Sequence, residues 1–458
     1  MDMKVQTNAD LMARRNAAIP RGIGNAHAIF AERALNSEIW DVEGKRYIDF
    51  CAGIAVVNTG HCHPKVVDAV KKQLAQFIHT CFQVVAYEPY IALAERLNKM
   101  APGPTAKKTF FMSSGAEAVE NAIKIARAAT GRSGIIAFNG GFHGRTMFSV
   151  ALTGKIDPYK KGFGPFPGEI YHVPFPHPLH GISDDDAINA LHTLFKYDIE
   201  ASRVAAIFVE AVQGEGGYIP ASNCFLCRLR QLCNEHGIML VLDEVQTGIG
   251  RCGKMFAHEH AGIEADIITL AKGLGGGFTL AAIIGKTEIM DAAAPGGLGS
   301  TYAGNPITIA AAHAVLDVME EEQICARSLV IGDRLRARFR LMQAKFNFIA
   351  EVRGLGAMTG VEFCYDNDPH KPAPDIANTL KSEAAKRGLL ILNCGVYGNV
   401  LRVMVPLTIS DAILDEGLQI IEVVLSEISL NPLTKTCVAT QKNRICATKP
   451  TCELEQAK

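Results

Sequence analysis

The sequence predicts an α/β fold in which helices cover both faces of a largely parallel sheet. Over the first two thirds of the chain, short apolar segments alternate with amphipathic ones, and the apolar segments show no polar–apolar alternation. Strands of this kind are buried on both faces, as in sheets whose parallel strands are joined by crossover helices. With 458 residues, the chain is long enough to build more than one domain.

The first part of the chain supplies the strands of this sheet. Residues 107–114 (KKTFFMSS) predict a strand that leads into a helix over 115–130, in which Val119, Ile123 and Ala126 share one face. A second helix is expected at 224–237. The later strands are expected at 134–140, 204–212, 238–245, 265–272 and 281–285.

The remainder of the chain predicts a smaller α+β domain, to which the N-terminal segment also belongs. A long helical stretch covers 306–346, and strands follow at 348–365, 388–394 and 400–406. The polar residues after Asn431 lack periodicity, so we expect a flexible tail. The predicted organisation is an N-terminal segment of the small domain (1–60), a large domain (61–330), a C-terminal small domain (331–430) and a tail (431–458).

Composition excludes several classes of partner. Lys and Arg number 46 against 47 for Asp and Glu, and a net charge of -1 offers no basic field for a nucleic acid. No apolar run reaches membrane-spanning length, and Asp2 and Asp10 argue against reading the N-terminal arginines as a transit peptide. The 13 scattered cysteines are typical of free thiols. We therefore expect a cytoplasmic protein without nucleic-acid or membrane partners.

Two alternative motifs are weak. The Cys and His residues within 224–233 and 61–63 lack a second pair at zinc-ligand spacing, so no metal site is predicted. Residues 248–255 (GIGRCGKM) match a phosphate loop up to Met255, which stands where the magnesium-binding Ser or Thr belongs. Nucleotide hydrolysis is therefore disfavoured.

Four features lie where predicted strands end, and ligands of parallel sheets bind at that edge. Gly115 opens a helix, whose first N–H groups attract anions. Asp243 places a carboxylate at the end of an apolar strand, and Phe142 and Arg145 offer a flat ring and a carboxylate-binding fork. Lys272 is the one lysine among apolar residues and glycines in DIITLAKGLGGGFTL. Taken singly, each could be a cap, a surface charge or a snorkelling lysine.

Together these features predict a site for pyridoxal phosphate. The phosphate needs an anion-binding turn, the ring nitrogen needs a carboxylate, and the aldehyde needs an amine. An apolar environment also lowers the pKa of a lysine, which makes the amine nucleophilic at neutral pH.

The chain resembles the class-III aminotransferases, which have the type-I fold of pyridoxal-phosphate enzymes, from about residue 14 to residue 425. The resemblance is carried by long motifs, among them WDVEGKRYIDFCAGIAVVNTGHCHPKVV (40–67), LDEVQTGIGRCGKMFAHE (242–259) and STYAGNPI (300–307). It implies a large cofactor-binding domain and a small domain built from both ends of the chain.

The resemblance implies roles for the residues that bind the cofactor. Lys272 would bond covalently to the cofactor and shuttle a proton, and Asp243 would pair with the ring nitrogen. The other contacts would come from Gly115 and Ala116 to the phosphate, Phe142 and Val245 to the two ring faces, Gln246 to the ring hydroxyl and Thr301 of the partner subunit to the phosphate. Ala116 stands where many relatives have Ser, which removes one side-chain donor.

Four further residues would bind substrate. The resemblance implies that Ile54 shapes the substrate channel, Arg145 binds the distal carboxylate and Arg402 binds the α-carboxylate of a keto acid. Glu215 would pair with Arg402 when the substrate lacks an α-carboxylate.

The activity implied by the resemblance is transfer of an amino group from 4-aminobutyrate to 2-oxoglutarate, giving succinate semialdehyde and glutamate. 5-Aminovalerate or another ω-amino acid is the alternative donor. An aminomutase or decarboxylase would use the same cofactor residues, but paired Arg145 and Arg402 suit exchange with a dicarboxylate. A non-catalytic protein would not need Lys272. A homodimer or a dimer of dimers is expected.

Overall fold

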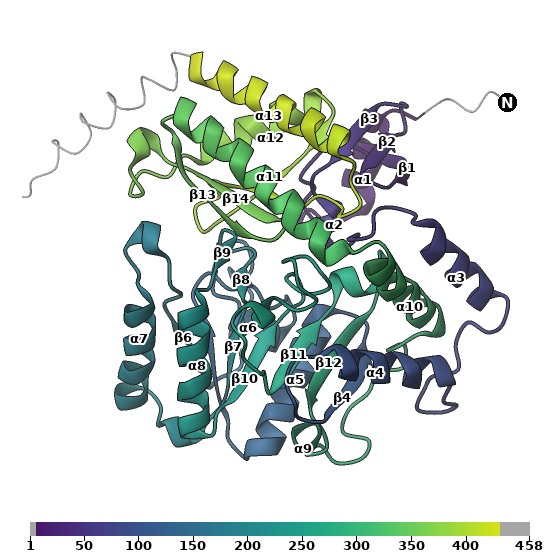
Figure 1. Cartoon of the computed structure of the whole chain (residues 1–458), viewed down its shortest axis with the longest axis vertical. Helices are drawn as coiled ribbons and strands as arrows, with labels where there is room; N and C mark the ends of the chain where they lie inside the picture. Colours follow the sequence, from purple (N-terminus) through teal and green to yellow (C-terminus); the bar gives the residue numbers. More distant parts are fainter. Residues whose placement is uncertain (1–5, 431–458) are drawn as a thin grey trace, which may run out of the picture.

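The computed structural model describes residues 6–430, in two layers that Figure 1 shows one above the other. The lower layer contains a large sheet with its helices, and the upper layer brings the N-terminal strands next to the C-terminal helices. The tail predicted for 431–458 lies outside the described residues.

The large sheet has seven strands, with one edge that collects the carboxyl ends of six of them. In spatial order they are β4 (Lys107–Met112), β12 (Ala281–Lys286), β11 (Ile267–Leu270), β10 (Met239–Asp243), β7 (Val204–Val209), β5 (Gly134–Phe138) and β6 (Ile170–Val173). β12 runs antiparallel to both of its neighbours, and every other pair is parallel. β4 therefore runs in the same direction as β11, and the predicted largely parallel α/β fold is confirmed.

Two separate cores explain why the strands lack polar–apolar alternation. Val241 and Ile267 belong to the core under α5 (Gly115–Thr130), whereas Leu240 and Leu242 belong to the core on the opposite face. The opposite face is covered by α4 (Glu88–Met100), α7 (Asp184–Tyr197) and α8 (Asn223–His236). Successive side chains point to opposite faces, so both sets must be apolar.

The helix predicted over 115–130 is α5, and a cap closes each of its ends. Ser114 Oγ accepts a hydrogen bond from Glu117 N, and the Glu117 carboxylate accepts one from Ser114 N in return. Gly131 follows the helix with a φ of +67°, which closes it without the strain that a side chain would add. The predicted inner face, with Val119, is buried.

The small domain combines both ends of the chain, as predicted. One sheet has the order β1 (Ala31–Leu35), β2 (Glu38–Asp41), β3 (Arg46–Asp49) and β15 (Leu389–Leu390), so the last strand comes from the C-terminal segment. The other sheet has the order β13 (Ile349–Leu355), β14 (Met358–Phe363), β17 (Val400–Val403) and β16 (Leu392–Cys394). The helices of this part are α1 (Asn8–Ala18), α11 (Ile324–Lys345), α12 (Pro374–Lys386) and α13 (Asp411–Leu430).

The long helical stretch expected over 306–346 is two helices rather than one. Gln323, with a φ of +54°, separates α10 (Pro306–Glu321) from α11. α10 packs on α3 (Pro64–Leu74) and α4, whereas α11 packs on β13 and β14. The break follows from this change of packing partner, which the local sequence does not signal. The boundaries of the predicted domains stay predictions.

The remaining α-helices and strands of the described chain are short. They are α2 (Ala52–Ala55), α6 (Met147–Leu152), α9 (Thr287–Met290), β8 (Val212–Gln213) and β9 (Ile219–Pro220). None of the helices within residues 6–430 has the length and apolarity that a membrane span requires. The ten cysteines in the same range are free thiols, as expected.

Replacing Gly332 by Ala is expected to destabilise the small domain. A Cβ at this position of α11 would lie 1.6 Å from the carbonyl oxygen of Gly356, in the turn of the β13–β14 hairpin. Backbone atoms cannot move aside easily, so we expect the free energy of unfolding to fall by about 1–3 kcal/mol. The measurement is the midpoint of urea unfolding. Gly168→Ala is the matched control, because a Cβ there meets no atom within 4 Å. Equal midpoints for the two variants would contradict the packing described.

Candidate active site

A cavity of about 400 Å³ opens at the edge where the parallel strands end. The loops that follow β4, β5, β7, β10 and β11 supply most of its lining. Among the predicted site residues, the lining contains Gly115, Ala116, Phe142, Arg145, Glu215, Asp243, Val245, Gln246 and Lys272. The fold thus brings together side chains from segments far apart in the sequence.

Lys272 lies two residues after the end of the strand β11 and reaches the cavity without a fixed partner. Its Nζ makes no hydrogen bond or ion pair with any residue in the described part of the chain. Burial lowers the pKa of Lys272, and the negative charges of Glu215 and Asp243 offset only part of that effect. A lowered pKa leaves more of the amine neutral at a given pH, and the neutral amine is the nucleophile.

Asp243, at the end of β10, is held by three donors. His143 Nδ1 donates to its Oδ2 at 2.7 Å, while Val245 N and Thr269 Oγ1 each lie 3.1 Å from Oδ1. The residue is only 4% exposed. Burial alone would lower the pKa of His143, but the hydrogen bond and charge of Asp243 outweigh it and raise that pKa. The three donors therefore fix the orientation of the Asp243 carboxylate at the base of the cavity.

His143 and Thr269 were not among the predicted site residues. His143 lies between Phe142 and Arg145 in the stretch GFHGRT, so its place in the sequence could have indicated it. Thr269 is one residue short of the end of β11 and carried no such signal.

Glu210 also lines the cavity and was not among the predicted site residues. It directly follows β7, and it accepts hydrogen bonds from Phe142 N at 2.8 Å and Gly214 N at 2.9 Å. Burial raises the pKa of Glu210 to about 7. The carboxyl group fixes the backbone of two neighbouring loops. Its position after a strand that ends at the cavity was the available signal.

The start of α5 forms an anion-binding turn. The cap between Ser114 and Glu117 occupies the third N–H group of the helix, and the N–H groups of Gly115 and Ala116 have no partner within residues 6–430. A Cβ on Gly115 would lie 3.0 Å from Val245 Cγ1, so glycine lets the helix begin close against Val245. Unpaired N–H groups and the helix dipole together favour a bound phosphate.

Gln246 presents a buried amide without a partner. Its Oε1 is buried and makes no hydrogen bond within the described residues, although the residue lines the cavity. An unpaired buried amide costs about 1–3 kcal/mol, so a polar group of a ligand is expected there. A ring hydroxyl or phenolate would satisfy the amide, because half a turn of the side chain presents either its oxygen or its nitrogen.

These groups fit pyridoxal phosphate. Gly115 and Ala116 could hold the phosphate, Asp243 could pair with the ring nitrogen, Gln246 could bond the ring hydroxyl, and Lys272 could bond to the aldehyde.

An ion pair between the two domains lies beside the cavity. Arg402 Nη1, from β17, donates to Glu215 Oε1 in the connection between β8 and β9, and Tyr159 OH donates to Glu215 Oε2 at 3.1 Å. Arg402 is 6% exposed. Burial opposes the charge on both partners, but their attraction lowers the pKa of Glu215 and raises that of Arg402. Both therefore stay charged. Tyr159 was not among the predicted residues.

Arg145 is an exposed cation at the same cavity. Its guanidinium carbon lies 4.7 Å from the centroid of the Tyr159 ring and 5.9 Å from that of the Phe142 ring. Arg145 forms no ion pair with a carboxylate in the described part of the chain, so it is available to a carboxylate of a ligand.

Three predicted residues do not line this cavity. Arg402 lies beside it, in the ion pair with Glu215. Ile54 is 40% exposed, and Val56 lines the cavity in its vicinity instead. Thr301 is exposed in the connection between α9 and α10. The roles of these three residues stay predictions.

Known proteins resemble this chain over almost its whole length. The family model described as "Aminotransferase class-III" matches residues 18–425. The 5-aminovalerate aminotransferase DavT of Pseudomonas aeruginosa is 54% identical over 424 residues, which cover 93% of this chain and 100% of that protein. The 4-aminobutyrate aminotransferase GabT of Escherichia coli is 53% identical over 417 residues, which cover 91% and 98%. The crystal structure of a Bacillus anthracis aminotransferase matches with a TM-score of 0.86 at 27% identity, covering 93% of this chain and 100% of that one.

The lowered pKa of Lys272 predicts its chemical reactivity. In cofactor-free protein, acetylation of Lys272 should rise at a lower pH than acetylation of Lys161, whose side chain is 75% exposed. Only the neutral amine reacts, and a lower pKa makes it neutral at lower pH. The measurement is the midpoint of each pH profile, followed by peptide mass spectrometry. Midpoints are compared rather than rates, because burial slows access without moving the midpoint. A midpoint for Lys272 at or above that of Lys161 would contradict the prediction.

Proposed function

This chain belongs to the class-III aminotransferases, which use pyridoxal 5'-phosphate, and we propose that it transfers the amino group of 4-aminobutyrate to 2-oxoglutarate, giving succinate semialdehyde and glutamate. The observation that carries the proposal is the Glu215–Arg402 ion pair next to the unpaired Arg145. The site thus contains one arginine, Arg145, that is free to bind a carboxylate of the substrate, and a second, Arg402, whose charge is neutralised by Glu215.

Lys272 is assigned the proton transfer. When bound, the cofactor supplies an electron sink and retains the amino group between the two substrates. Lys272 would hold the cofactor between turnovers and move a proton from the amine-bearing carbon of the substrate. Its unpaired Nζ and lowered pKa support this role.

Asp243 is assigned the task of keeping negative charge where the ring nitrogen binds. The donors from His143, Thr269 and Val245 support this role, since they orient the carboxylate toward a fixed position in the site. The Glu210 carboxyl group would hold the loop of Phe142 in place by accepting a hydrogen bond from the backbone N–H of Phe142.

The ion pair between Arg402 and Glu215 would let one site accept substrates with either one or two carboxylates. 4-Aminobutyrate has a single carboxylate, distal to its amine, which Arg145 would bind. Glu215 would then neutralise Arg402, which otherwise is a buried cation without a partner. Glutamate and 2-oxoglutarate carry a second carboxylate. That group would displace Glu215 and take the planar fork of Arg402.

The length of the amino donor is the finer part of the proposal. The similarity to DavT supports 5-aminovalerate as much as the similarity to GabT supports 4-aminobutyrate. These donors differ by one methylene, which is worth only about 1–3 kcal/mol in an apolar pocket.

The substrate proposal is tested by kcat/KM for 4-aminobutyrate, 5-aminovalerate, β-alanine and ornithine, with 2-oxoglutarate as acceptor. We expect 4-aminobutyrate to be the best donor and 5-aminovalerate to follow within about 200-fold. Ornithine should be poor, because it differs from 5-aminovalerate by an α-ammonium, which would bring a second positive charge next to Arg145. A higher value for 5-aminovalerate would replace the named donor while keeping the reaction. Ornithine as the best donor would overturn the ω-amino acid assignment.

Replacing Glu215 by Gln should impair the half-reaction with 4-aminobutyrate far more than the half-reaction with glutamate. Without the carboxylate, Arg402 becomes an uncompensated buried cation, and loss of one partner typically costs about 3–5 kcal/mol. The α-carboxylate of glutamate removes that penalty. Single-turnover changes in the cofactor absorbance measure each half-reaction separately.

The matched variant is Arg402→Lys, which should spare 4-aminobutyrate and impair glutamate and 2-oxoglutarate, because an ammonium cannot reproduce the bidentate fork. Equal losses in both half-reactions for Glu215→Gln would mean that the ion pair has only a structural role.

The functional unit is proposed to be a homodimer in which Thr301 of the partner subunit contacts the phosphate. The exposure of Thr301 outside the cavity of its own chain supports this. The near balance of charge supports small molecules rather than nucleic acid as partners, and the free cysteines support a cytoplasmic location.

Thr301→Ala should therefore weaken retention of the cofactor without changing the fold. A hybrid dimer of one Thr301→Ala chain and one Lys272→Ala chain should contain one intact site, because each site takes these residues from different chains. Light scattering and cofactor retention on gel filtration provide the measurement. An active monomer, or two damaged sites in the hybrid, would contradict the shared site.

A further inference from the structure

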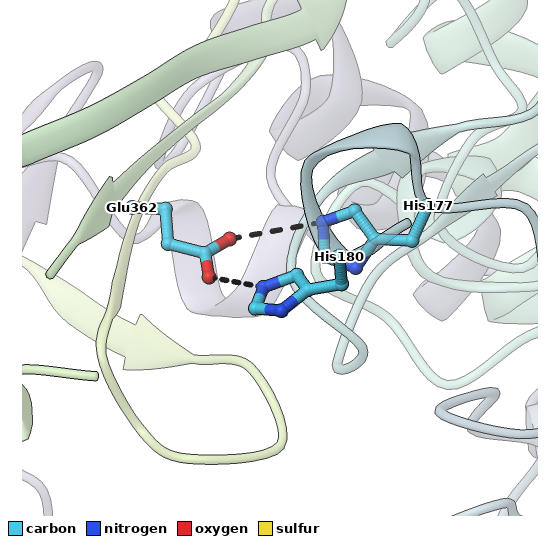
Figure 2. A group of neighbouring side chains, drawn as sticks. All are labelled: His177, His180 and Glu362. Atoms are coloured by element: carbon cyan, nitrogen blue, oxygen red, sulfur yellow. Dashed lines mark hydrogen bonds and ion pairs between the residues drawn. The ribbon is translucent and has the colours of Figure 1, made fainter. Parts of the chain in front are cut away.

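A second group of side chains gathers between the domains, away from the cavity that Lys272 lines. His177 and His180 lie in the segment between β6 and α7 of the large domain, and Glu362 lies on β14 of the small domain. Figure 2 shows both imidazoles facing the carboxylate. His180 Nε2 lies 2.8 Å from Glu362 Oε1, and His177 Nε2 lies 3.8 Å from Glu362 Oε2. One ligand atom from each residue lies within 4.8 Å of the others.

His177 has a ring nitrogen that makes no hydrogen bond within the described chain. Its Nε2 is buried and has no hydrogen-bond partner within residues 6–430. A neutral imidazole is the form that binds metals. An unpaired buried nitrogen also costs free energy, which a bound ion would recover.

Around Glu362, carboxylates outnumber guanidinium groups. Arg353 Nη1 contacts Glu362 Oε2 at 2.7 Å and also contacts Glu351 Oε2, so one guanidinium is shared between two carboxylates. The three groups therefore carry a net charge of about -1. Arg353 occupies one carboxylate oxygen, while the other faces His180 and lies 3.4 Å from Asn399 Nδ2. These contacts orient the carboxylate in the way that outer partners orient metal ligands.

A cavity of about 350 Å³ provides space for a further ligand. His177, His180 and Glu362 all contribute to its lining, together with Gln213 and Gly216. Two imidazoles and one carboxylate, completed by water, make up a tetrahedral zinc site, with metal–ligand distances of about 2.0–2.2 Å. Two nitrogen ligands disfavour magnesium and calcium, which prefer oxygen.

We propose that His177, His180 and Glu362 bind a divalent transition-metal ion of the zinc class at the interface between the two domains. Binding moves the His180 proton from Nε2 to Nδ1, so that Nε2 can donate its lone pair to the metal. Because the ligands come from both domains, the ion stabilises their contact. It binds the folded protein and not the unfolded chain, so it raises the unfolding temperature.

The test compares cofactor-loaded wild type with His177→Gln and His192→Gln. His177 is the informative position, because its Nε2 makes no hydrogen bond whose loss would disturb the fold. His192 is exposed on α7 and serves as the matched control. Isothermal titration with Zn²⁺ should show one site in wild type and His192→Gln that His177→Gln loses or binds at least about 100-fold more weakly. The comparison subtracts zinc bound by exposed cysteines.

Two further readouts follow the same three proteins. Co²⁺ should produce the visible absorption of a four-coordinate ion in wild type and His192→Gln only, and Zn²⁺ should raise the unfolding temperature in the same two. Equal zinc stoichiometry and affinity in all three proteins would overturn the proposal, as would equal cobalt spectra. Transamination is not a readout here, so failure of the metal site would leave the proposed function untouched.

Discussion

Six strands of the large sheet run in one direction, and the site depends on that common direction. Parallel strands deliver their carboxyl ends to the same edge, where β4, β10 and β11 lead into Gly115, Asp243 and Lys272. The two antiparallel steps across β12 return β4 to the shared direction. If β12 paired parallel to both neighbours, the start of α5 would still lie at this edge. If only one of the two pairings of β12 were antiparallel, β4 would run in the opposite direction, and the start of α5 would lie at the opposite edge of the sheet.

The buried ionisable groups of the site are of two kinds. Those paired with an opposite charge stay ionised, and those without such a partner can exchange protons. Arg402 and Glu215 neutralise each other, so both stay ionised despite their burial. Lys272 has no such partner, and burial lowers its pKa. Glu210 lacks a cationic partner of its own and has its pKa raised to about 7. A buried group therefore stays ionised where an opposite charge lies within contact distance. Where no such charge is present, burial shifts its pKa toward the neutral form.

The interface between the two domains is where substrate choice and the proposed metal site meet. Arg402 and Glu362 lie on neighbouring strands, β17 and β14, of the small domain, and both face groups of the large domain. Arg353 links the two regions, because it contacts Glu362 and also donates to the carbonyl oxygen of Gly217, two residues from Glu215. A movement of the small domain would therefore change both sites together.

By itself, the sequence determined the elements and the residues at strand ends. Apolar runs specified the buried strands, Gly115 was predicted to open a helix, and Lys272 was conspicuous as a lysine in an apolar context. The substrate residues were predicted from the resemblance to a family. Only the tertiary structure decided the contacts of Glu210, His143 and Tyr159, the break at Gln323 and the meeting of His177 with Glu362. The physical reason is range: periodicity and caps act within a few residues, whereas a partner 185 positions away is selected by strand register and domain packing.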